Sequence, residues 1–252
     1  MSSIAPNFGG AISKILRIVF ISMTAGFIFT GCGGSESTDK GGERLGEVKM
    51  PDYFPFRSDS YWAYSWNNIR GDAWTSSMSV VSSHTDQNLQ VFIVADSTER
   101  YGQFIVHRSA YLWDGEGLKH LYRTITGGDC TTFLPPRLVL PFKISGAKPH
   151  GYDYRCQVFD PTGTLKYAVN IHQSQKLVEA GVPVEVGEGR WDDCVAVETM
   201  WSTTYTSGAR ETHRKAIWYA RQVGPVRIVA GIPTRSPSLE GEETGVLVAS
   251  HL

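Results

Sequence analysis

The residues best suited to chemistry in this chain are its cysteines, because a thiol can act as a nucleophile, bind a metal or form a disulfide. Three of the four are Cys130, Cys156 and Cys194, and the chain contains no Cys-x-x-Cys pair. A Cys130–Cys156 disulfide would close a proline-rich loop and stabilise the fold by about 3 to 4 kcal/mol through chain entropy. A different pairing, or three free thiols, fits the sequence as well. At Cys194 we expect a small buried side chain where a strand begins.

No other set of polar residues has the spacing of a catalytic or metal site. The seven histidines are scattered singly, so a zinc site is not expected. Asp192 and Asp193 are neighbouring carboxylates, but adjacent residues of a strand point to opposite faces. Glu211, His213 and Lys215 alternate along one face of a predicted strand and fit a solvated surface. We therefore expect no enzymatic activity, no catalytic residue, no metal and no cofactor.

The charge balance argues against a nucleic-acid partner. The 252 residues include 24 basic and 25 acidic side chains, with a formal net charge of −1 and no basic block. The chain also holds 7 Trp, 11 Tyr and 11 Phe, an aromatic content that favours strands over helices.

The fourth cysteine, Cys32, ends an N-terminal segment of a different kind. Lys14 and Arg17 precede an uncharged, mostly apolar run over residues 18–31. This run is shorter than the roughly 20 apolar residues of a spanning helix, and it is typical of a signal peptide. A transmembrane anchor is the alternative. The last four residues, FTGC, resemble the bacterial lipoprotein signal, in which the chain is cut before a cysteine that becomes acylated.

This resemblance implies a protein attached to a membrane by lipid. We expect residues 1–31 to be removed and Cys32 to carry the acyl groups, palmitate among them. Two or more chains give stable attachment, since a single chain binds only reversibly. Residues 32–50 are rich in Gly, Ser and charge and should form a flexible tether. Gly33 favours the outer membrane, because lipoproteins retained in the inner membrane usually carry Asp at that position.

From residue 51 to residue 252 the dominant sequence pattern has a period of two. Segments such as 61–66 and 194–205 alternate as strands do, and the β-branched, apolar segment 89–96 is typical of a strand buried on both faces. Turn sequences such as DGEG and DPTG separate the predicted strands. Only residues 165–180 would suit a helix, and their first half fits the return strand of a hairpin equally well. We predict an all-β domain, built as a single antiparallel curved sheet or half-open barrel with at most one or two short helices, because a large sheet with one apolar face must curl or close.

Three segments of this domain resemble one group of bacterial envelope lipoproteins. They are DYFPFRSDSYWAY (52–64), VEVGEGRWDDCVAVET (184–199) and IWYARQVGPVRI (217–228). The group is that of the DUF3108 or TapB-like envelope lipoproteins, relatives of the LolA/LolB curved-sheet fold. The resemblance implies a fold and a place in the cell envelope, and it implies no reaction.

The motif residues are expected to be structural. Trp62, Tyr64 and Trp218 should anchor the core, each with one hydrogen-bond partner for its polar tip. Gly224 should permit a backbone angle or a close strand approach that a side chain would block. Pro225 stands where the group usually has Leu, and it predicts a sheet edge or a bulge because proline donates no ladder hydrogen bond.

Together these patterns predict a non-catalytic binding or assembly module of the cell envelope. The concave face of a half-barrel lined by Trp, Tyr and Val would suit an acyl chain or another apolar ligand. The alternative is a structural subunit whose sheet edge or aromatic patch docks onto an outer-membrane or secreted protein complex.

Overall fold

The computed structural model describes residues 45–86, 89–125, 127–187, 189–234 and 238–251. The described residues belong to one compact unit, Arg44–Leu252. The predicted signal peptide and Cys32 therefore lie outside the described residues. The compact unit contains, in chain order, β1 (Val48–Lys49), a turn of 3₁₀ helix (Met50–Asp52), β2 (Tyr61–Asn68), β3 (Ala73–Asp86), β4 (Leu89–Arg100), β5 (Gln103–Trp113), β6 (Gly117–Ile125), β7 (Cys130–Pro141), β8 (Lys143–Ile144), β9 (His150–Phe159), β10 (Leu165–Val186), β11 (Gly189–Thr204), β12 (Arg210–Ala220), β13 (Gly224–Ala230) and β14 (Glu243–His251).

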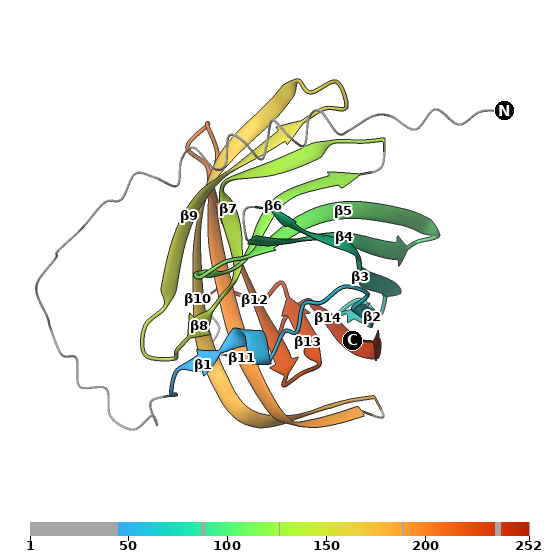
Figure 1. The fold of residues 1–252 in the computed structure, drawn as a ribbon, viewed down its shortest axis with the longest axis vertical. Coiled ribbons are helices and arrows are strands. Elements are labelled where there is room, and N and C mark those ends of the chain that lie inside the picture. Colours follow the sequence, from blue (N-terminus) through green and yellow to red (C-terminus); the bar gives the residue numbers. More distant parts are fainter. Residues whose placement is uncertain (1–44, 87–88, 126, 188, 235–237, 252) are drawn as a thin grey trace, which may run out of the picture. The chain divides into compact units, whose positions relative to one another are not determined.

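The long strands form a closed antiparallel barrel in the order β10-β11-β12-β13-β14-β2-β3-β4-β5-β6-β7-β9 (Figure 1). The all-β class agrees with the prediction, but the barrel is closed, so the expected curved sheet or half-open barrel is wrong in this respect. Closure depends on β14, the last strand, which pairs with β2, the first long strand, from Glu243↔Asn68 to His251↔Tyr61. Strand β9 pairs with β10 along its whole length and with β7 only from Cys130↔Phe159 to Leu134↔Arg155. Pairing of this kind satisfies backbone groups that a sheet edge would leave open.

Residues 165–180 belong entirely to strand β10, so the helix alternative is wrong. The turn before β10 fixes this outcome, because the Asp160 carboxylate accepts hydrogen bonds from the backbone N–H groups of Thr162 and Thr164. Its hairpin then places Val169 opposite Cys156 and continues to Gln175. In the described part of the chain, no helix has the length and apolar character needed to cross a membrane.

The folded unit begins before residue 51, which corrects the expected end of the tether. Strand β1 pairs with β8 through Val48↔Ile144, and the side chain of Met50 is 0% exposed. Leu45 also packs against the main core. These apolar side chains are separated by charged and small residues, which hides them in a composition typical of a tether.

A short segment, residues 50–56, closes one end of the barrel, and we call it the plug. Its rings enter the core: the Phe54 and Trp62 ring centroids lie 5.3 Å apart, and those of Phe56 and Phe92 lie 5.0 Å apart. Met50 donates its backbone N–H to Phe142. Burying each such aromatic side chain contributes about 1.5 to 3 kcal/mol, so the plug is an integral part of the fold.

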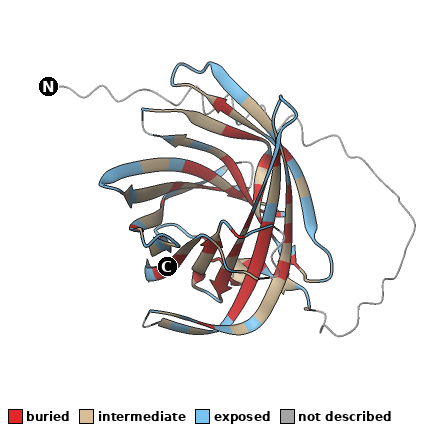
Figure 2. Cartoon of the chain, turned by 180° about the vertical axis from the view of Figure 1, so that it is seen from behind, coloured by how far each residue is buried: buried red, intermediate tan, exposed pale blue. Residues whose placement is uncertain are grey.

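The opposite end of the barrel carries the hairpin turns at 101–102, 160–164 and 205–209. Their tips are largely exposed, as the pale blue hairpins in Figure 2 show. The two ends therefore differ: Trp62 and Phe92, which face inward at the plugged end, are fully buried, whereas Ile105, Ile125 and Tyr167, which face inward at the other end, reach solvent. We call the second end the mouth.

Candidate functional site

The interior of the barrel is the candidate site, and strand register defines which residues face it. Alternate residues of a strand point to one side, and Phe92, Leu177 and Trp62 fix the inner side because they are buried in the main core. Following the pairs around the wall from these residues gives a consistent inner set. A barrel of eight strands is filled by its own side chains, and a wider one leaves space between them. We call this interior of the 12-stranded barrel the lumen.

The lumen is reachable from the mouth to about half its depth. Tyr111, Arg137 and Lys215 face inward near the middle and are only half-buried. Trp62 and Phe92, which face inward nearer the plug, are 0% exposed. Water-sized molecules therefore reach the middle of the barrel, and the aromatic plug prevents passage beyond it.

Apolar side chains line the lumen near the mouth. Ile105 is 42% exposed, Ile125 41% and Tyr167 55%, although register directs all three inward. Trp66 and Trp74 stack on the same inner face with ring centroids 5.8 Å apart. This arrangement gives the entrance an apolar wall that is open to solvent.

Two cations face each other in the middle of the lumen. Lys215 enters from β12 and Arg137 from β7, and both burial and the charge of Arg137 act to lower the pKa of the Lys215 ammonium, to about 7. The ammonium lies 5.7 Å from the ring centroid of Trp201. Within the described residues, neither cation forms an ion pair with a carboxylate.

Histidine and tyrosine side chains surround Arg137. His120 lies opposite Arg137 in the β6–β7 register, with its ring centroid 4.5 Å from that of Tyr111 and 4.7 Å from that of Phe133. Burial, together with the charges of Arg137 and Arg123, holds the pKa of His120 well below its usual value, so this imidazole is neutral at physiological pH.

The remaining lumen charges near the mouth have partners or close counter-charges. Burial raises the pKa of Asp96, and the charge of Arg123 partly offsets this rise. Ser109 donates a hydrogen bond to the Asp96 carboxylate. Arg100 forms an ion pair with Glu243 at 3.3 Å. The lumen therefore carries a surplus of positive charge, and this surplus is centred on the pair in the middle.

Two glutamines hold the wall together where β7 leaves β9. Beyond Leu134, β7 has no backbone pairing to β9, and Gln175 of β10 donates its amide hydrogens to the Val139 carbonyl and the Thr199 hydroxyl. Gln173 donates in the same way to the Leu138 carbonyl. The amide oxygens of both glutamines are buried without a partner, as is Nε of Arg137.

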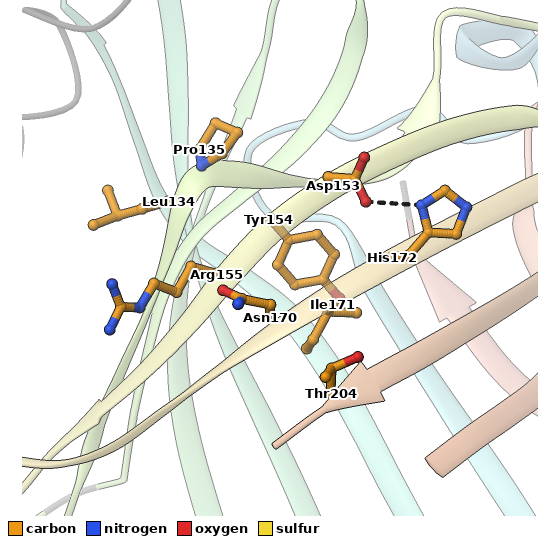
Figure 3. A pocket seen from close by; sticks show the side chains of 9 residues that line it. All are labelled: Leu134, Pro135, Asp153, Tyr154, Arg155, Asn170, Ile171, His172 and Thr204. Carbon is orange, nitrogen blue, oxygen red and sulfur yellow. Dashed lines mark hydrogen bonds and ion pairs between the residues drawn. The ribbon is translucent and has the colours of Figure 1, made fainter. Parts of the chain in front are cut away.

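A second concavity, about 390 Å³ in volume, lies at the fork between β7 and β9 (Figure 3). Register places Leu134, Arg155 and Asn170 in one row on the outer side of the wall. Next to them, His172 Nδ1 lies 2.8 Å from the Asp153 carboxylate, and both side chains are largely exposed. Solvent surrounds this pair, so the groove is a shallow outer surface rather than an enclosed site.

The predicted core anchors Trp62 and Tyr64 lie on the inner face of β2. Trp62 Nε1 donates to the Val223 carbonyl at 2.7 Å, and the Tyr64 hydroxyl donates to the Pro225 carbonyl at 3.1 Å. Both bonds tie β2 to the segment around Gly224, which β2 does not pair with directly. Gly224 has φ +105°, and a Cβ there would lie 2.7 Å from Trp62 Nε1.

Trp218 and the bulge at Pro225 lie on the neighbouring pair of strands. The Trp218 side chain is 4% exposed, points to the outer side of β12, and donates from Nε1 to Glu179 at 2.8 Å. The β12–β13 register shifts between Trp218 and Tyr219, opposite Pro225. A bulge is therefore present where the proline predicts one.

Cys130, Cys156 and Cys194 are free in the structure, so of the alternatives left open by the sequence it has three free thiols and no Cys130–Cys156 disulfide. Register gives the reason: Cys130 is opposite Phe159 and Cys156 is opposite Phe133, three residues further along. An odd offset directs the two side chains to opposite faces of the wall. Cys194 is 0% exposed, and burial raises its pKa to about 11, which leaves an unreactive thiol.

The acidic pair of the sequence analysis lies outside the lumen. Asp193 accepts hydrogen bonds from Arg221 and the Tyr53 hydroxyl, and chiefly the Arg221 contact lowers its pKa. Asp192 pairs with Arg190. Among the described residues, no group of three or more His, Cys, Asp or Glu is placed to hold a metal.

The inward orientation of Lys215 was not predicted. Glu211, His213 and Lys215 lie on the inner wall by register, where Glu211 and His213 are solvent-exposed as expected and Lys215 is half-buried. The signal was present further along the strand, because Ile217 and Tyr219 continue the same alternation and Tyr219 is 3% exposed. The inward orientation of Arg137 could not be predicted from alternation, because Arg137 follows two consecutive prolines and precedes a bulge.

No family model matches the chain, and no curated protein matches it. Two solved structures are similar in fold. A candidate lipoprotein from Parabacteroides distasonis has 13% identity and a TM-score of 0.49, and the match covers 79% of this chain and 98% of that one. A candidate exported protein with a YmcC-like fold from Bacteroides fragilis has 10% identity and a TM-score of 0.44, over 79% of this chain and 99% of that one.

Proposed function

We propose that this chain is a lipid-anchored protein of the cell envelope, with the outer membrane as the favoured location, and that its barrel binds an apolar ligand without catalysing a reaction. The observation that carries the binding proposal is the asymmetry of the lumen. One end is closed by the aromatic plug, and the other opens through Ile105, Ile125 and Tyr167, which are exposed although they face inward. An apolar molecule that enters there would cover these side chains and displace water from them.

The binding proposal is tested with the purified full chain and a neutral fluorescent probe, a fatty-acid methyl ester carrying an anthroyloxy group. We expect saturable binding that weakens in Ala230→Phe, because Ala230 lies opposite Lys215 in the lumen and a ring there would fill the space. Ala95→Phe is the matched control, since Ala95 is on the outer side of β4 opposite Arg108. Absence of saturable binding, or equal weakening in both variants, would contradict the proposal.

The anchoring proposal is tested at Cys32, in the signal that resembles those of lipoproteins. We expect the wild-type chain to lose residues 1–31, gain the mass of its acyl groups and fractionate with the membrane. Cys32→Ala should show none of these changes. If both proteins keep residues 1–31 and remain in the membrane fraction, the apolar run is a transmembrane anchor and the lipoprotein assignment fails.

The alternative, a structural subunit of an envelope complex, now depends on the outer surface. Closure of the barrel pairs most strand edges of the described residues. Where β7 leaves β9 beyond Leu134, Gln173 and Gln175 already bond to the β7 carbonyls at Leu138 and Val139. The groove in Figure 3 is the outer concavity that a partner chain would contact, and its row of Arg155, Asn170 and Asp153 is polar and exposed. Stoichiometric co-purification of an envelope protein that is lost in Arg155→Glu would favour this function over ligand binding.

A further inference from the structure

Among the described residues, the central cation pair of the lumen forms no ion pair with a carboxylate. Lys215 lies opposite Thr199, and Gln175 links the Thr199 hydroxyl to the carbonyl of Val139, two residues from Arg137. Burial, and in addition the charge of Arg137, lower the pKa of the Lys215 ammonium. Arg137 also leaves its Nε buried without a hydrogen-bond partner. Removing a charged group from bulk water is costly unless a partner compensates for the loss of hydration. Two cations held together without such a partner favour an anion between them.

The other charges of the lumen do not supply that anion. Asp96 lies opposite His107, and the cation acting on it is Arg123. Glu243 is paired with Arg100 near the mouth. Glu211, which faces the lumen two residues from His213, accepts a hydrogen bond from the Tyr205 hydroxyl at 2.7 Å. Each of these carboxylates thus has a partner or a close counter-charge other than the central pair.

The depth of the pair beneath the mouth suits a molecule with one charged end. Lys215 is five residues from the start of β12 at Arg210, which is about 16 Å along the strand at 3.3 Å per residue. A strand tilt of 35 to 45° reduces this to roughly 12 Å of depth. The wall above the pair combines polar side chains with apolar ones, among them Ile105, Ile125 and Tyr167. A ligand whose head reaches the cations would therefore keep an apolar tail beside the exposed residues of the mouth.

We propose that Arg137 and Lys215 bind the anionic head group, a carboxylate or phosphate oxyanion, of an apolar-chain ligand whose tail extends through the lumen to the mouth. This inference rests on the proposed function of the lumen and specifies the charge and orientation of its ligand. The Arg137 guanidinium would donate from Nε and a terminal nitrogen to one oxyanion, and the Lys215 ammonium would donate to the same group. Trp201 remains against the Lys215 ammonium and limits its movement.

The test compares three probes of equal chain length on the full chain at pH 6: an anthroyloxy fatty acid, its methyl ester and the corresponding alkyl phosphate. We expect the wild-type chain to bind at least one anionic probe about 10- to 100-fold more tightly than the ester. This is the difference in affinity that hydrogen bonds between the cations and a charged head group would add. Lys215→Met and Arg137→Met should each remove most of this preference and leave ester binding intact. The acid and the phosphate together show which oxyanion the site prefers.

Matched controls are Lys148→Met and Arg108→Met, since both residues are exposed and neither forms an ion pair among the described residues. Lys215→Arg retains the charge and should retain the preference. If wild type binds the anions and the ester equally, the inference fails while the proposed function stands. A preference that survives both Met substitutions places the anion elsewhere and also overturns the inference. If no probe binds, the proposed function fails as well.

Discussion

Replacing Lys215 by Met should stabilise the ligand-free protein below pH 8. Folding lowers the pKa of Lys215 from 10.5 to about 7, so between these values the unfolded chain binds more protons than the folded one. The free energy of unfolding therefore increases as pH rises through this window. A pKa fall of this size corresponds to at most about 5 kcal/mol. Because water reaches the lumen, we expect about 2 to 3 kcal/mol.

The assay is urea unfolding of the wild-type protein, Lys215→Met and the control Lys148→Met at pH 6 and pH 10, after extraction of bound lipid. At pH 6, Lys215→Met should be more stable than wild type by about 2 to 3 kcal/mol, since Met fills a similar volume without the charge. At pH 10 the difference should fall below about 1 kcal/mol, because most wild-type lysine is then neutral in the folded state. The reasoning is refuted if Lys215→Met is less stable than wild type at pH 6, or if its advantage is the same at both pH values.

Three further perturbations test the fold around the lumen. Gly224→Ala should lower the free energy of unfolding by about 2 to 4 kcal/mol in chemical denaturation, because φ is +105° and the new Cβ would meet Trp62. A loss below about 0.5 kcal/mol would contradict this. Phe56→Ala should cost about 3 to 5 kcal/mol by the same assay, through the cavity it leaves in the plug; an unchanged midpoint would show that the plug is not packed. Alkylation of the denatured, unreduced protein should modify both Cys130 and Cys156, and a peptide joined by these two residues would show that the register between β7 and β9 is wrong.

The strands were predictable wherever the period-two pattern is strong. Residues 61–66 and 89–96 were correctly placed in strands, because their alternating or β-branched apolar residues are those that a barrel wall buries on one or both faces. The bulge at Pro225 was predictable from the missing N–H alone. Closure was not, because it depends on the pairing of β14 with β2, the last and the first strand of the barrel, and nothing local in either strand determines that these distant segments meet.

The candidate site was largely hidden from sequence analysis. Lys215 and Arg137 come from strands whose facing sides depend on register, and the bulges between His120 and Tyr122 shift that register on one side of the barrel. A sequence shows that a lysine alternates with apolar residues, but not that an arginine from a distant strand lies opposite. The buried amide oxygens of Gln173 and Gln175 likewise follow from the separation of β7 from β9, a feature of the closed barrel and not of either segment.

The most direct test of the central claim, that the lumen binds an apolar chain by its charged head, is a crystal structure of the full chain grown with a fatty acid brominated near its tail. We expect anomalous bromine density in the lumen near Ile105 and Ile125, with the carboxylate between Arg137 and Lys215. Bromine only in the outer groove beside Arg155, or no bound acid at a saturating concentration, would contradict the claim.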